Sequence, residues 1–96
     1  MKNVRIQDLA GSFAENKDKA REIRTQIGPL LAKGEEVTLD FAGVDAATQS
    51  FIHALLSELI RERESAVLDK ILFKNCNETV RKIITIVTDY LQEAER

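Results

Sequence analysis

Asp40, Asp45, His53 and Cys76 are the side chains whose types and positions suggest chemistry. Asp40 and Asp45 flank the end of a predicted strand. They could hold Mg²⁺ as a carboxylate pair, or they could accept backbone N–H groups there. The lone histidine, His53, is a candidate general base or metal ligand, but no other His or Cys lies near it in sequence, which favours a helix-surface or interface position. Cys76 precedes a predicted helix N-terminus, where a thiolate would be stabilised; the alternative is a small buried hydrophobe.

Composition and missing motifs exclude several classes of function. Gly43 stands alone, without a G-x-G-x-x-G or Walker pattern, so nucleotide binding is not expected. Fourteen Lys and Arg against sixteen Asp and Glu leave a net charge of −2, which argues against a nucleic-acid partner. One cysteine excludes an internal disulfide. No apolar run approaches the 18 residues of a membrane span, and the first residues lack a signal-peptide pattern. We therefore expect a cytoplasmic protein without a cofactor or a metal ion.

The hydrophobic pattern predicts strands that alternate with helices. Strands are predicted over residues 3–7, 36–41 and 70–74. Helices are predicted over residues 17–27, 48–63 and 78–92. This β-α-β-α-β-α order indicates an α/β fold, a small single domain over residues 1–96 with a parallel or mixed sheet and right-handed crossovers. The continuous apolar run 71–73 suggests that the last strand is central.

Shorter signals concern the ends of these elements. Residues 8–12 are predicted to form a turn, with Phe13 as an anchor beneath it. Gly28-Pro29 should end or kink the first helix, unless the apolar stripe continues to Gly34. Asn75 is the predicted N-cap of the last helix. In an open parallel sheet a site forms at the carboxyl ends of the strands, so functional residues are expected in the loops there.

The segment 40–56 is the most informative part of the chain, with Leu39-Asp40-Phe41 at the strand end, Val44 in the loop and Ser50-Phe51 at the helix start. This pattern resembles the STAS domains of anti-sigma-factor antagonists, and more closely a compact STAS-like family of bacterial proteins, whose layout the strand over 71–75 and the helix over 80–84 also fit. Two positions depart from the antagonists, which have Asp where this chain has Thr48 and Gly where it has Phe51. The resemblance implies a STAS-like fold.

The resemblance also implies a function as a regulatory protein–protein interaction module rather than an enzyme. The implied partner is a serine kinase or anti-sigma factor with a histidine-kinase-type ATPase fold. Ser50 aligns with the serine that such a kinase phosphorylates, and Thr48 is the alternative phosphoacceptor. The implied partner-binding residues are Asp40, Val44, Asp45, Thr48, Gln49, Ser50, Phe51, His53 and Ala54.

A phosphate on Ser50 would meet two opposing local influences. The helix N-terminus carries free N–H groups and a partial positive charge, which tolerate a phosphate. Residues 34–60, however, contain five carboxylates and no Lys or Arg. We therefore expect no arginine to clamp the phosphate, so that its charge of about −1.5 to −2 repels a docked partner.

Three alternative functions remain open on the sequence. A partner could dock on residues 44–54 without phosphorylation. The broad apolar girth of the helix over 48–63 could form a homodimer surface, which would make the chain a structural or oligomerising unit. A small hydrolase could use Asp40 and His53, although the sequence shows no nucleophile–base pair close together.

Overall fold

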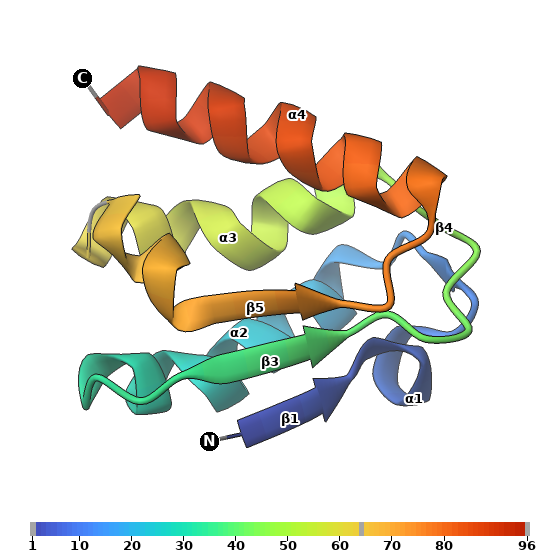
Figure 1. Cartoon of the computed structure of the whole chain (residues 1–96), viewed down its shortest axis with the longest axis horizontal. Coiled ribbons are helices and arrows are strands. Elements are labelled where there is room, and N and C mark those ends of the chain that lie inside the picture. Colours follow the sequence, from blue (N-terminus) through green and yellow to red (C-terminus); the bar gives the residue numbers. More distant parts are fainter. Residues whose placement is uncertain (1, 64, 96) are drawn as a thin grey trace.

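Parallel strands form the main sheet of the chain, whose computed structural model describes residues 2–63 and 65–95 (Figure 1). The sheet contains β1 (Lys2–Arg5), β3 (Val37–Asp40) and β5 (Ile71–Lys74), side by side in that order. Two shorter strands, β2 (Phe13–Ala14) and β4 (Ala46–Ala47), pair in a second parallel sheet. The helices are α1 (Ile6–Ala10), α2 (Lys17–Ala32), α3 (Gln49–Arg63), the 3-10 helix η1 (Ser65–Lys70) and α4 (Glu78–Glu95). The predicted α/β fold with a parallel sheet is confirmed.

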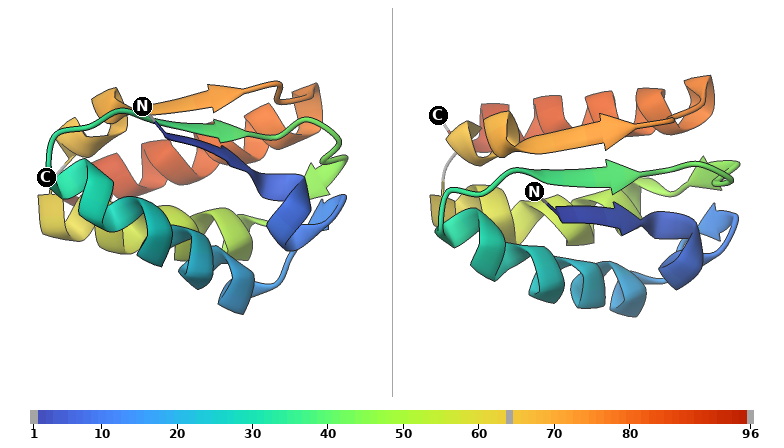
Figure 2. Two further views of the ribbon diagram at one scale, coloured as in Figure 1. Left: turned by 90° about the horizontal axis from the view of Figure 1, so that it is seen from below. Right: turned by 60° about the horizontal axis from the view of Figure 1, so that its bottom comes forward.

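The three long helices cover one face of the main sheet. The strand order moves in one direction along the chain, so successive right-handed crossovers place α2 and α3 on the same side. Figure 2 shows α4 on that side as well, next to α3. None of the described helices is long and apolar enough to cross a membrane.

The core lies between this helical layer and the sheet. Val37 and Leu39 of β3 are fully buried and lie on the same side of their strand, since residues two apart share a side.

The strand order β1-β3-β5 makes β3 the central strand. The prediction that the strand near residue 71 is central is therefore wrong. β5 lies at the edge, and Leu72 on its uncovered face is 46% exposed.

The broad apolar girth of α3 is used inside the molecule. Its buried side chains are Phe51, Ile52, Leu55, Leu56, Leu59 and Ile60. They pack where the helix meets the sheet, α2 and α4. The apolar side chains of α3 are therefore already covered within one chain, and a homodimer stays a prediction about the oligomeric state of the chain.

The first long helix runs through Pro29 and ends at a glycine. Gly34 adopts a φ of +82°, and its N–H donates to the Leu31 carbonyl at 3.0 Å. The Glu35 N–H donates to the Leu30 carbonyl at 3.1 Å. These two bonds are those of a Schellman motif, which satisfies the last carbonyls of a helix. The prediction that this helix ends near residue 27, at Gly28-Pro29, is therefore wrong; the apolar stripe continues to the buried Leu31, as the sequence also allowed.

Two predictions about short segments near the N-terminus are wrong. Residues 8–12 are not a simple turn, because α1 extends through most of this segment and closes on Gly11, whose N–H donates to the Gln7 carbonyl at 2.9 Å. Phe13 is not a buried anchor, since it is 51% exposed at the start of β2. Ala14, the next residue, turns inward and is fully buried.

Replacing glycine by alanine should have opposite effects on stability at two positions. Gly43 has a φ of +81°, in the left-handed region, whereas Gly28 lies within helix α2, where an added Cβ would be 3.9 Å from Leu59 Cδ2. We expect Gly43→Ala to lower the free energy of unfolding by about 1 kcal/mol through backbone strain, since only the mobile Gln7 amide blocks the new methyl group. Gly28→Ala should raise it by about 0.5–1 kcal/mol. Urea unfolding of both variants checks this, and equal effects of the two changes would contradict it.

Candidate functional site

The segment between β3 and α3 is tied down by the second sheet. Phe13 pairs with Ala46 and Ala14 with Ala47, which holds this segment beside the chain between α1 and α2. The Asp45 N–H donates to the Ser12 carbonyl at 2.7 Å, just before the pair begins. The predicted docking loop is therefore a fixed surface with a defined shape.

Asn77, which precedes α4, also holds the segment between β3 and α3 through hydrogen bonds. Its Nδ2 donates to the carbonyls of Asp45 at 2.8 Å and Val44 at 3.3 Å, while its Oδ1 accepts the Val80 N–H at 2.8 Å. The last contact makes Asn77 the N-cap of α4. The prediction that Asn75 caps this helix is wrong. Asn75 has a φ of +58° and donates instead to Asp40.

Thr48 and Ser50, the two hydroxyl residues at the start of α3, have different surroundings. Thr48 Oγ1 accepts the Phe51 N–H at 3.0 Å, so this side chain is the N-cap of the helix. The Thr48 N–H in turn donates to the Ala14 carbonyl at 3.0 Å. Ser50, two residues later, is exposed on the first turn. Of the two candidate phosphoacceptors, Ser50 is the more accessible one.

The predicted partner-binding residues divide by their exposure. Those exposed are Asp45, Gln49, Ser50 and His53, and those half-buried are Asp40, Thr48 and Ala54. Val44 and Phe51 lie in the core, at 3% and 0% exposure. A docked partner could not touch Val44 or Phe51, so these two residues shape the surface from beneath.

Asp40 is held by hydrogen bonds at the carboxyl end of β3. Its Oδ1 accepts from Asn75 Nδ2 at 2.9 Å and from the Ala42 N–H at 2.9 Å. The bond from Asn75, and then that from Ala42, keep the pKa of this carboxyl below its usual value of 3.8. Lys74 and Arg5, its neighbours in the sheet register, lower the pKa further. Asp40 thus has the structural role that the sequence allowed as the alternative to Mg²⁺ binding.

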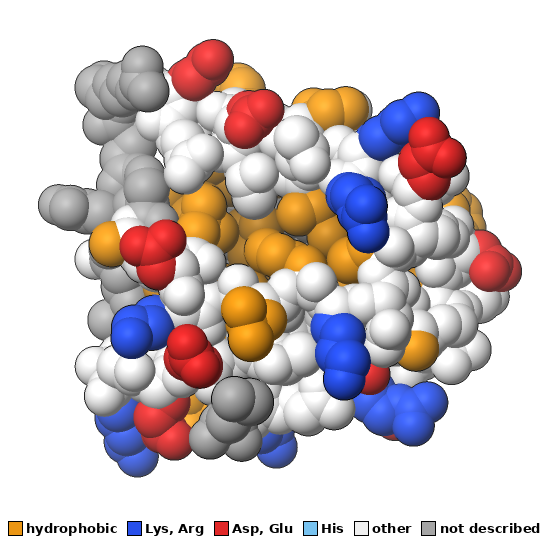
Figure 3. All heavy atoms as spheres, in the orientation of Figure 1, with side chains coloured by type: hydrophobic (Ala, Val, Ile, Leu, Met, Phe, Trp, Pro, Cys, Tyr) orange, Lys and Arg blue, Asp and Glu red, His pale blue; other side chains and the backbone are white. Residues whose placement is uncertain are grey.

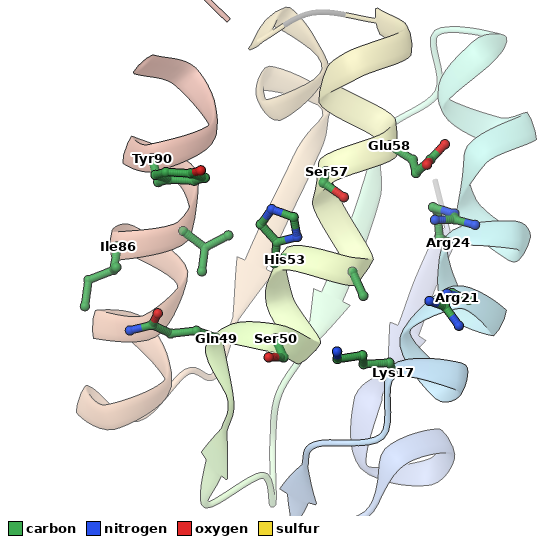
Figure 4. Close-up of a pocket in the computed structure, with 12 residues that line it drawn as sticks. Lys17, Arg21, Arg24, Gln49, Ser50, His53, Ser57, Glu58, Ile86 and Tyr90 are labelled. Atoms are coloured by element: carbon green, nitrogen blue, oxygen red, sulfur yellow. The ribbon is translucent and has the colours of Figure 1, made fainter. Parts of the chain in front are cut away.

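Four of the predicted residues line a groove on the helical face. Gln49, Ser50, His53 and Ala54 project from α3 into a hollow of about 590 Å³, which α2 borders on one side and α4 on the other (Figure 4). The remaining lining residues are Ser57 and Glu58 of α3, Lys17, Arg21 and Arg24 of α2, and Ile86, Val87 and Tyr90 of α4. We call this hollow the three-helix groove.

Positive charge in the three-helix groove comes from α2. Lys17, Arg21 and Arg24 line the same hollow as Ser50, and Figure 4 shows the Lys17 side chain extending toward that serine. The stretch without Lys and Arg around Ser50 in sequence therefore does not describe its surroundings in space, although the side chain that extends toward the serine is a lysine and not the clamping arginine that was considered. The expectation from the sequence was based only on the residues next to Ser50 along the chain, whereas these cations belong to α2, the helix that precedes β3. Their spacing of four and three residues, which puts them on one face of a helix, is the signal that could have found them.

The remaining candidates for chemistry do not converge. His53 lines the three-helix groove, where its ring lies 6.3 Å from that of Tyr90, whereas Asp40 is not among the groove residues. Among the residues that the structure describes, no group of three or more His, Cys, Asp or Glu could hold a metal ion. A hydrolytic pair of Asp40 and His53 has no support in this arrangement.

Cys76 lies in a second, separate hollow between β5 and α4, where Figure 3 shows hydrophobic side chains at the surface. Its side chain is half-buried and packs against the core. Burial raises the pKa of the thiol, an effect that Arg81 opposes. A raised pKa means less thiolate at neutral pH, so the structure favours the small hydrophobe over the reactive cysteine.

Comparison with known protein families finds a match to this chain. A family model described as a STAS-like domain of unknown function matches residues 19–81. The match runs from α2 through β3, α3 and β5 to the first turn of α4, and so includes Ser50 and most of the three-helix groove. Searches of the curated proteins and of the solved structures found no significant match.

The hydrogen bond from Asn75 to Asp40 can be tested by titration. Asn75→Gly removes the donor and keeps the positive φ, so the pKa of Asp40 should rise toward 3.8. The bonds to the ionised carboxylate stabilise the fold fully above pH 3.8, and this contribution is lost as the pH falls through the lowered pKa. NMR titration of the Asp40 side-chain carboxyl carbon measures the change. Lys74→Gln should raise the pKa less, and a larger rise in that variant than in Asn75→Gly would contradict the assignment.

Proposed function

Because the chain belongs to the family of STAS-like domains, we propose that it is a regulatory protein–protein interaction module of the bacterial cytoplasm rather than an enzyme. A protein partner docks on the exposed residues of the segment 44–54. Phosphorylation of Ser50 by a partner kinase switches the complex. The resemblance to anti-sigma-factor antagonists implies a serine kinase or anti-sigma factor with a histidine-kinase-type ATPase fold as that partner.

The position of Ser50 is the observation that carries this proposal. The residue is exposed on the first turn of α3, where free backbone N–H groups and the helix dipole favour negative charge. The neighbouring Thr48 hydroxyl is already engaged as the N-cap. The backbone that presents Ser50 is held by β4 and by Asn77, so a kinase would meet the serine in a defined geometry.

The cations of α2 determine how the switch would act. A phosphate on Ser50 adds about −1.5 to −2 charge to a groove that is lined by three cations, Lys17, Arg21 and Arg24, and by one carboxylate, Glu58. Charge-assisted hydrogen bonds from these side chains to the phosphate are stronger than neutral ones. Phosphorylation would thus neutralise the groove from within the same chain, and a partner attracted by its positive charge would be released.

Phosphate mapping on the chain from its own cells tests the proposal. We expect one phosphate on Ser50, found by mass spectrometry of peptides from the affinity-tagged chain. The signal should fall to background in Ser50→Ala. Ser57→Ala is the matched control, because Ser57 lies two turns further along α3 in the same groove, and its removal should leave the phosphate in place.

The same experiment distinguishes the alternatives. A phosphate that persists in Ser50→Ala and disappears in Thr48→Ala would move the phosphoacceptor to Thr48. A chain that carries no phosphate under any growth condition, and that no purified kinase of the histidine-kinase-type ATPase fold labels, would overturn the switch. Thr48→Ala also removes an N-cap, so its folding is checked by circular dichroism.

A further inference from the structure

Small side chains form part of the floor of the three-helix groove, beside the larger Gln49, His53 and Glu58. Ser50, Ala54 and Ser57 follow one another along the outer face of α3 at spacings of four and three residues. Figure 4 shows Lys17 of α2 and Tyr90 of α4 extending toward α3 from either side, whereas Ile86 points away from it. Small residues between two walls allow the backbone of another helix to approach closely, at the 8–10 Å that separates the axes of packed helices.

One wall of the groove is basic. Lys17, Arg21 and Arg24 repeat along α2 at helical spacing and span about 10 Å of its length. Arg21 makes an ion pair with Asp18 at 3.2 Å, but both side chains are exposed, and such a pair contributes only about 0.2–1 kcal/mol. This wall therefore remains available to the carboxylates of a ligand.

The opposite wall is apolar and exposed. Ile86 and Tyr90 lie one turn apart on α4, outside the buried stripe of that helix, and they are 49% and 61% exposed. The Tyr90 ring also leans toward His53 on the floor, with 6.3 Å between ring centroids. The apolar surface that this wall offers to a ligand is therefore that of Tyr90, next to the His53 ring.

From these two walls we infer that the three-helix groove binds an acidic amphipathic helix of a partner protein. Its carboxylates, spaced like the cations of α2, face Lys17, Arg21 and Arg24, and its apolar side chains cover the Tyr90 ring. Complementary charge sets the orientation of this helix, and burial of the apolar wall adds affinity. This inference shares with the proposed function only the idea that this face is a docking surface, and it requires no phosphate.

A synthetic peptide tests the groove without any kinase or ATP. The probe is a helical peptide of about four turns with Glu along one edge and Leu along the next, and its control has the same composition in scrambled order. Titrated into the ¹⁵N-labelled full chain at low salt, the amphipathic peptide should shift amide signals along the groove. Those signals belong to residues 17, 21, 24, 50, 54, 57, 86 and 90. The scrambled peptide should bind at least about tenfold more weakly, which corresponds to about 1.4 kcal/mol.

Pairs of variants with the same change of charge show which side chains of the groove contact the peptide. Arg21→Gln combined with Arg24→Gln should weaken peptide binding about tenfold or more, because it removes two of the three cations. Lys2→Gln combined with Lys70→Gln removes the same charge from exposed positions outside the groove and should leave binding nearly unchanged. Tyr90→Ser should weaken binding through the other wall, and thermal unfolding confirms that each variant is folded.

Several outcomes would overturn the inference. Equal binding of the two peptides, signal shifts outside the groove, or unchanged affinity of the Arg21/Arg24 variant would each do so. Tighter binding to phosphatidylserine vesicles than to the peptide would assign the groove to a membrane surface. A dimer in sedimentation equilibrium that Tyr90→Ser dissolves would assign it to a second copy of the chain. Because the peptide experiment uses unphosphorylated protein, its failure leaves the Ser50 switch to be judged by its own test.

Discussion

The burial of α3 is the constraint from which the rest of the arrangement follows. Its six fully or nearly fully buried apolar side chains each stabilise the fold by about 1.5–3 kcal/mol, and they occupy more than half of the girth of the helix. A helix of this kind must be covered on several sides, which the sheet, α2 and α4 accomplish. What remains in contact with solvent is a narrow strip, and this strip carries Ser50, His53 and Ser57.

This constraint brings together parts of the chain that are far apart in sequence. Because α2 must lie against α3, the cations on the outer face of α2 line the same groove as Ser50 at the start of α3. The segment that leads into α3 is positioned independently, by the β2–β4 pair and by Asn77. The backbone at the start of α3 is thus held by contacts within the chain.

The sequence predicted those features that depend on local periodicity, and missed those that depend on long-range pairing. Val37 and Leu39 alternate with polar residues, and the apolar stripe around Ile23 repeats every three or four residues, so these elements were recognised. The β2–β4 strands have two residues each and carry no periodicity. The choice of Asn77 over Asn75 as N-cap depends on which of these two asparagines, two residues apart, reaches Val80 and which reaches Asp40, a matter of tertiary geometry.

The charge around Ser50 shows most clearly where reading along the chain is insufficient. Residues 34–60 are free of Lys and Arg, which in sequence indicates an acidic surface, yet the groove in which Ser50 lies has a basic wall. At an ionic strength of 0.15 M, charges interact over about 8 Å, so the residues that lie near one another in space decide the local potential, whatever their separation in sequence. In a parallel α/β unit a helix packs against the helix of the preceding crossover. The electrostatics of the start of α3 therefore depend on the outer face of α2, and a change of charge there should act on a partner of α3 as directly as a change in the docking segment itself.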